Sequence, residues 1–255
     1  MSEKRGLDAP DLLGITPVAR ALERVTDSVL SGAEALLGRI CLPAAEEFGL
    51  LLRDKVSRWR QQNVLSTVAR AQPLLQQAAS DNRHAPPRLI MESLNYASWA
   101  DHEEVQQMWA GLLASSCTLD GEDDSNWIFI NLLAQLTAMQ ARILNFSSET
   151  AEKRALPSGL IVSRGLARTA DELVGLTGCT DIQRIYRELN HLCALGLIQF
   201  AFSAGSDKQA QADIRPTSLA LHLYIRAQGS LESPMEYFSC SAADAPDVRG
   251  LPDSD

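Results

Sequence analysis

Residues 92–115 read ESLNYASWADHEEVQQMWAGLLAS and contain both the start of a helix and its regular apolar face. Asp101 followed three residues later by Glu104 has the spacing of a capping box, with acids at the positive helix end. The apolar residues that follow recur at helical spacing: Val105, Met108, Trp109, Leu112 and Leu113. This stretch therefore predicts a helix with one buried face.

Similar signals extend in both directions along the chain. Thr16-Pro17 begins a predicted amphipathic helix that ends before Pro43, and a second helix runs from Ala44 towards Arg70. Residues 127–137 are apolar nearly all round, which predicts a helix buried on most sides, and 138–146 continue as helix. The predicted structural core comprises Phe48, Trp59, Trp109, Leu112, Leu113, Leu133 and Leu136.

The region after residue 168 has a different pattern. Thr169 and Glu172 form a second capping box, Gly178 turns the chain, and Thr180 is expected to cap a second helix that ends at Gly196. Strand-like residues 197–202, a polar tip and a return strand at 213–217 follow, before a helix at 218–227. The predicted fold class is mainly α: a helical bundle followed by a small winged-helix-like module with two or three short strands.

Charge and composition divide the chain further. The net charge is −9, and residues 229–255 carry six acids against one base. We expect a flexible N-terminus at 1–11, a helical bundle at 12–150, a linker at 151–168, the winged-helix-like module at 169–228 and an acidic disordered tail at 229–255. The acidic balance disfavours a strongly basic nucleic-acid binder. No signal segment or membrane span is predicted, so a cytoplasmic protein with free thiols is expected.

No motif predicts catalysis, and we expect a protein that is not an enzyme and uses no cofactor. The chain has no Gly-x-Ser-x-Gly, phosphate loop or dinucleotide fingerprint. Asp101 and Glu104 have metal-ligand spacing without a distant histidine, and 120–131 lacks the Gly and Glu of a calcium loop, so no metal is expected. The cysteines at apolar positions are expected to be buried: Cys41, Cys117, Cys179 and Cys193.

Three passages together resemble one bacterial family. They are PAAEEFGL at 43–50 with Arg58-Trp59-Arg60 and Asn63 after it, residues 92–115, and LLAQLTAMQARIL at 132–144. In these passages the chain resembles the abortive-infection alpha (Abi-alpha) family, over roughly residues 40–225. The resemblance implies a role in defence against phage and carries no catalytic residues to this chain.

The second helix of the back module presents the candidate contact residues. For a protein or nucleic-acid partner these are Gln183, Arg184, Arg187, Asn190 and His191, with Lys208 on the wing. Asp181, Glu188 and Asp207 oppose the positive charges, so DNA binding is possible but not favoured.

The function we expect is antiphage action through contacts with an unidentified phage or host protein. Two alternatives stay open: a winged-helix DNA-binding regulator, and a membrane-perturbing effector that uses the N-terminal amphipathic helices. The positive residues around Trp59 are scattered over the helix, which makes a membrane surface the less favoured partner.

Overall fold

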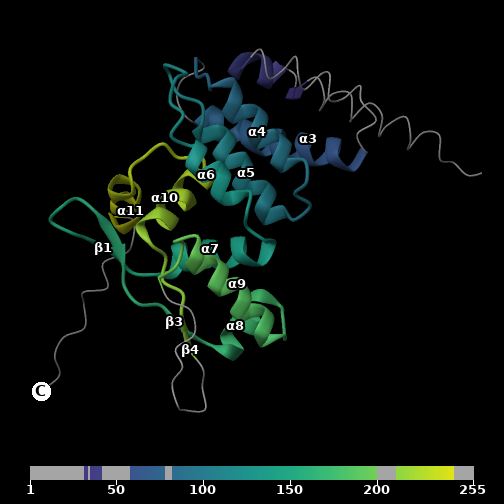
Figure 1. Ribbon diagram of the computed structural model, residues 1–255. Helices are drawn as coiled ribbons and strands as arrows, with labels where there is room; N and C mark the ends of the chain where they lie inside the picture. Colours follow the sequence, from purple (N-terminus) through teal and green to yellow (C-terminus); the bar gives the residue numbers. More distant parts are fainter. Residues whose placement is uncertain (1–31, 34, 42–57, 78–81, 200–210, 244–255) are drawn as a thin grey trace, which may run out of the picture.

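The computed structural model describes residues 32–33, 35–41, 58–77, 82–199 and 211–243. Within these residues the chain is mainly helical, with two small antiparallel sheets (Figure 1). The labelled helices are α3 (Arg58–Gln77), α4 (Pro87–Ala97), α5 (Glu103–Ser115), α6 (Trp127–Leu133), α7 (Ala138–Thr150), α8 (Ala170–Thr177), α9 (Ile182–Ala194), α10 (Ser218–Ala227) and α11 (Pro234–Ala243). The strands are β1 (Lys153–Ala155), β2 (Ile161–Ser163), β3 (Ala167–Thr169) and β4 (Gln211–Asp213).

Helix α5 lies at the centre of the front half. It contacts α3, α4, α6, α7 and α10, and nearly every residue from Val105 to Ser115 is buried. Trp109 and Leu112 are buried, as predicted, in a core that α6, α7 and the back module share. Leu113 instead packs in a second core with α3, α4 and the helical residues 35–40. One helix therefore joins two hydrophobic cores.

The capping box predicted at the start of α5 is wrong. The helix begins at Glu103 with His102 at the N-cap and no side-chain capping bond. Glu104 accepts from Arg142 Nε at 3.1 and 3.2 Å, and Glu103 pairs with Arg70 of α3 at 3.1 Å. Because these carboxylates bind arginines of other helices, they are not available for capping, although both still lie at the positive end of α5.

Other sequence expectations for the front half also need correction. Trp59 is 40% exposed, and Leu136 is only partly buried, whereas Leu133 is buried. Helix α3 continues through Pro73 instead of ending near Arg70. Phe48 and the predicted helix start at Thr16 lie outside the described residues.

Helix α6 is shorter and less buried than predicted. It ends at Leu133, and Ile128 on its outer side is 58% exposed. Thr137 starts α7 with a capping box, accepting from Gln140 N, while the Gln140 side chain accepts from Thr137 N. The apolar run 127–137 is therefore divided because Thr137 takes the cap position of the next helix.

The back module places β3 before the helix pair α8 and α9 and β4 after it. Strand β3 pairs antiparallel with β4, in the register Ala167↔Asp213, and Ile198 forms a single bridge with Pro216. The return strand thus lies at 211–213 and not at 213–217. Pro216 has no N–H to extend the pairing, and Thr217 already caps α10.

Two segments expected to lack structure contain regular elements. Residues 151–168, predicted as a linker, contain the β1–β2 hairpin, in which Arg154 pairs with Val162, and the first two residues of β3. The tail predicted as disordered contains α11, whose Tyr237 meets Tyr224 edge to face at 6.4 Å. The ring of Tyr237 gives this segment an aromatic surface that packs against α10, although the acidic composition of the segment predicted disorder. In the described part of the chain no helix is long and apolar enough to cross a membrane.

The N-cap of α8 should contribute measurably to stability. Thr169 accepts from Glu172 N, and Glu172 accepts from Thr169 N, as the sequence predicts. We expect Thr169→Ala to lower the free energy of unfolding by about 1 kcal/mol in urea titrations. Thr180→Ala is the matched control, because Thr180 precedes α9 but does not cap it. This substitution should lower the free energy of unfolding by no more than about 0.5 kcal/mol. Equal costs for both variants would contradict this assignment.

Candidate surface on helix α9

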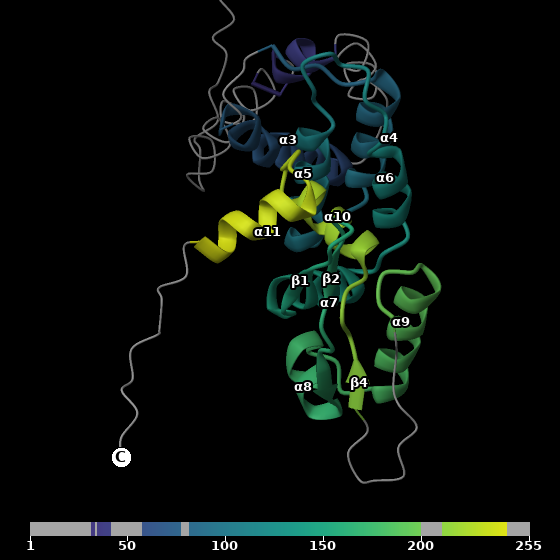
Figure 2. The same cartoon turned by 90° about the vertical axis from the view of Figure 1, so that its left-hand side faces the viewer.

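Helix α9 presents one exposed face and one buried face. Its buried side chains are Ile185, Glu188, Leu189 and Leu192. Apart from Ala194 at its C-terminal end, the exposed residues, here called the α9 surface, are Gln183, Arg184, Tyr186, Arg187 and Asn190. Four of these five were predicted from the sequence, and α9 lies at the outer edge of the back module in Figure 2.

The carboxylate of Asp181 belongs to the helix cap. It accepts from the backbone N–H groups of Gln183 at 3.0 Å and Arg184 at 3.2 Å. Asp181, and not Thr180 as predicted, is therefore the N-cap residue of α9. An acid at this position stabilises the positive end of the helix.

Glu188 is a buried charged residue of α9. Only 6% of it is exposed, and its Oε2 accepts from Thr137 Oγ1 at 3.1 Å. Its Oε1 accepts from Arg187 Nη2 at 3.3 Å. A buried carboxylate needs such partners, and these bonds attach α9 to the start of α7.

His191 takes part in the same junction. Its Nδ1 lies 2.9 Å from Gln140 Nε2 and 3.2 Å from Gln140 Oε1, and the Gln140 Nε2 also donates to Glu188 O at 3.2 Å. His191 is consequently half-buried and held by α7, so it is not the exposed contact residue that was predicted. Lys208, predicted on the wing, lies outside the described residues.

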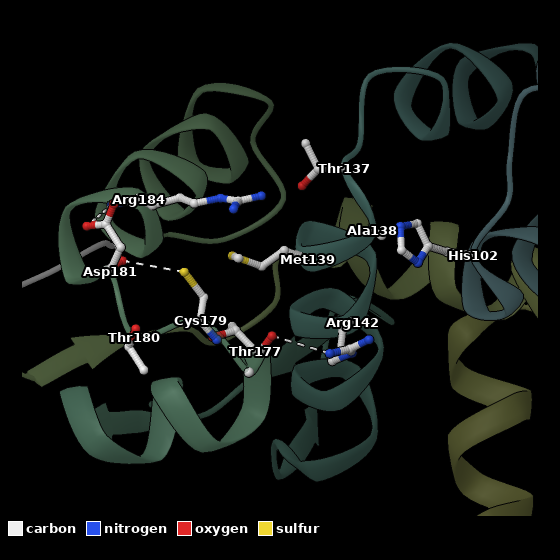
Figure 3. A pocket seen from close by; sticks show the side chains of 11 residues that line it. His102, Thr137, Ala138, Met139, Arg142, Thr177, Cys179, Thr180, Asp181 and Arg184 are labelled. Carbon is white, nitrogen blue, oxygen red and sulfur yellow. Dashed lines mark hydrogen bonds between the residues drawn. The ribbon is translucent and has the colours of Figure 1, made fainter.

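A pocket of about 620 Å³ lies between the start of α5, the start of α7 and the turn from α8 to α9 (Figure 3). Arg184 extends across it toward Thr137, and the Cys179 thiol donates to Asp181 O at 3.8 Å. Its lining residues are His102, Thr137, Ala138, Met139, Arg142, Thr177, Gly178, Cys179, Thr180, Asp181 and Arg184.

Arg142 is a charged lining residue that already binds protein atoms. Arg142 Nη1 donates to Thr177 O at 3.3 Å, while its Nε donates to Glu104. His102 lies at the opposite end of the pocket from Cys179, so the thiol and the imidazole do not form a pair (Figure 3). The guanidinium of Arg184 has no hydrogen bond or ion pair within the described residues. It is therefore the lining group most able to bind an incoming anion.

The cysteines divide into two classes. Cys41 and Cys117 are buried as expected, and burial raises the pKa of the Cys117 thiol to about 12. Cys179 and Cys193 are only partly buried. A thiol with so high a pKa stays protonated and unreactive at neutral pH.

Two exposed tryptophans form a second surface feature, which the sequence analysis did not identify. Trp59 of α3 and Trp99 after α4 are 40% and 60% exposed, with ring centroids 6.1 Å apart. Arg60 lies 4.1 Å from the Trp99 ring and donates to Ser98 Oγ at 2.8 and 3.0 Å. We call Trp59, Arg60 and Trp99 the tryptophan cluster. Trp59 fits the apolar stripe of its helix, so periodicity alone assigned it to the core.

Tyr186 is the α9 surface residue that the sequence analysis missed. It is 45% exposed, and Asn190 Nδ2 donates to its carbonyl oxygen at 2.9 Å. Its spacing from Gln183 and Asn190 places it beside the predicted contact residues on a helical wheel. That spacing was the signal that could have identified it.

Fold and surface together define a mainly helical protein with a helix-pair module whose second helix exposes a polar, positively charged face. The family model for abortive infection alpha matches residues 60–229, about two thirds of the chain, so the chain belongs to that family. Two of the three resembling passages, 92–115 and 132–144, lie inside this match, whereas 43–50 and α11 lie outside it. No curated protein and no solved structure matches the chain.

Proposed function

We propose that this protein defends a bacterial cell against phage by abortive infection, and that it acts in the cytoplasm through protein contacts and not through catalysis. The observation that carries the proposal is the family match over residues 60–229. That match covers α5, the back module and the α9 surface, which supports the proposal that the folded core is the acting part.

The tryptophan cluster supports contact with a protein partner. The few residues that dominate binding at protein interfaces are enriched in tryptophan, tyrosine and arginine. Large rigid aromatic rings bury much area for little loss of side-chain entropy. Trp59 and Trp99 expose such rings side by side, and Arg60 is fixed between its bonds to Ser98 and the Trp99 ring. A preorganised cluster of this kind reduces the entropic cost of binding.

The test compares phage yields in the native gene context. Cells that carry the gene should give fewer plaques with at least one phage, with protection at low phage dose and death or arrest of infected cells at high dose. The double variant Trp59→Ala/Trp99→Ala should lose protection by at least about tenfold in plaque number, because a tryptophan at an interface contributes about 2 kcal/mol or more.

The control is Leu119→Ala/Leu160→Ala, which removes two other exposed apolar side chains of comparable exposure. It should protect like the original protein, with both variants expressed in soluble form. Unchanged phage yield across a broad panel would overturn the defence role. Full protection by the tryptophan variant would overturn only the contact through the tryptophan cluster.

A further inference from the structure

We propose that the α9 surface binds duplex DNA, with α9 lying in the major groove and its arginines contacting phosphates. This goes beyond the proposed protein contacts and uses a different surface. The net charge of −9 argues against DNA binding by the chain as a whole. The proposal therefore depends on which charged side chains are exposed on α9.

The structure removes one of the two neighbouring acids from the exposed side of α9. Glu188 is buried against Thr137. Asp181 stays exposed at the N-cap, where its carboxylate accepts from the backbone N–H groups of Gln183 and Arg184. Of the two acids expected to oppose the arginines at these positions, only Asp181 therefore lies at the surface, at the end of the helix before the α9 surface begins.

The two arginines have donors available for phosphate. Arg187 keeps one bond to Glu188, but its side chain is 73% exposed. Arg184 crosses the mouth of the pocket toward Thr137 (Figure 3), and its guanidinium makes no hydrogen bond with the described residues. Arginine binds phosphate oxygens through two parallel N–H groups, which suits both positions.

The shape of α9 favours duplex DNA over duplex RNA. Its 13 residues span about 20 Å, and a helix about 10–12 Å wide fits the major groove of B-DNA. The major groove of A-form RNA is too deep and narrow for side chains to read. Gln183 and Asn190 lie on either side of the two arginines along α9, and such amides hydrogen-bond to base edges. The Asn190 Nδ2 keeps its bond to Tyr186 O, which leaves the amide oxygen and the second N–H for a base.

The experiment measures fluorescence anisotropy of a labelled 20-base-pair DNA duplex with the full chain at 50 and 200 mM salt. The expected dissociation constant is of order micromolar at 50 mM salt. Two phosphate contacts predict a slope of about −1.8 for the logarithm of the association constant against the logarithm of salt concentration. An RNA duplex of the same sequence should bind several-fold more weakly.

Arg184→Gln/Arg187→Gln should weaken DNA binding at least tenfold and remove most of the salt dependence. Arg154→Gln/Arg164→Gln is the control: it removes the same charge from exposed residues around the β1–β2 hairpin, apart from α9 in Figures 1 and 2. The control should bind within twofold of the original chain. The control should keep the melting temperature of the original chain, because Arg154 and Arg164 are exposed. Arg184→Gln/Arg187→Gln should stay folded with a slightly lower melting temperature, because the buried Glu188 loses its bond to Arg187.

Three results would overturn the proposal. They are no binding at 100 µM protein in 50 mM salt, an equal loss in both double variants, and equal affinity for the DNA and RNA duplexes. An equal loss in both variants would indicate attraction by net charge alone.

Discussion

Gly111→Ala should destabilise the protein by about 3 kcal/mol or more, although the same change stabilises most helices. A Cβ at Gly111 would lie within 2 Å of Ala227 O and 2.2 Å from Ala227 C. These are backbone atoms at the end of α10, so no side-chain rotation relieves the clash. Overpacking of a core usually costs 1–3 kcal/mol, and a collision with fixed backbone exceeds that range.

Neighbouring hydrogen bonds hold the two helices together at this point. Ser115 Oγ donates to Arg226 O at 2.9 Å, and Asn126 Nδ2 donates to Ser115 Oγ at 2.9 Å. If α10 moves away to admit a methyl group at Gly111, these buried polar groups lose their partners. Urea unfolding followed by circular dichroism measures the change.

Gly175→Ala in α8 is the matched control. Nothing lies within 4 Å of a Cβ built there, and the position is exposed. Replacing a helical glycine by alanine should then raise the free energy of unfolding by about 0.5–1 kcal/mol. A stabilising Gly111→Ala would show that α5 and α10 do not approach as closely as the structure has them.

Leu113→Ala should lower the free energy of unfolding by about 2–5 kcal/mol. Leu113 is fully buried in the core formed by α3, α4 and residues 35–40. The substitution loses the favourable free energy of moving the deleted leucine atoms out of water. It also leaves a cavity that the surrounding helices cannot fill. The melting temperature and the urea midpoint should both fall.

Leu119→Ala provides the comparison, since Leu119 follows the same helix but is 66% exposed. Leu119→Ala should lower the free energy of unfolding by no more than about 0.5 kcal/mol. A cost below about 1 kcal/mol for Leu113→Ala would contradict the presence of the second core. It would also mean that the front half is held by the Trp109 core alone.

Local signals predicted some helix ends correctly, although the capping box at Asp101 and the cap at Thr180 were wrong. Thr169 with Glu172 and the turn at Gly178 were found correctly, because a cap needs only residues within one turn of each other. The burial of Trp109 and Leu112 followed from helical periodicity for the same reason. The resemblance of residues 92–115 and 132–144 to the family likewise depends only on short segments of sequence. The family match confirms that resemblance.

Predictions failed where a residue had several possible partners. Glu104 can cap a helix or bind an arginine, and only the position of Arg142 on α7 favours the ion pair. Glu188 is a helical carboxylate in the sequence, but Thr137, 51 residues away, allows it to be buried. Trp59 lies on an apolar stripe, and its exposure depends on which elements cover that side of α3.

By itself, the sequence determined the mainly helical class, the cap at Thr169, the burial of Trp109 and the family, because each depends on near neighbours or on apolar periodicity. Only the tertiary structure decided that Leu113 faces a different core from Leu112, and that Gly111 must stay a glycine beside Ala227. It also decided which charges remain exposed on α9. The physical reason is that ion pairs, close backbone approach and burial are set by groups distant in sequence, whose positions are fixed only when all helices pack together.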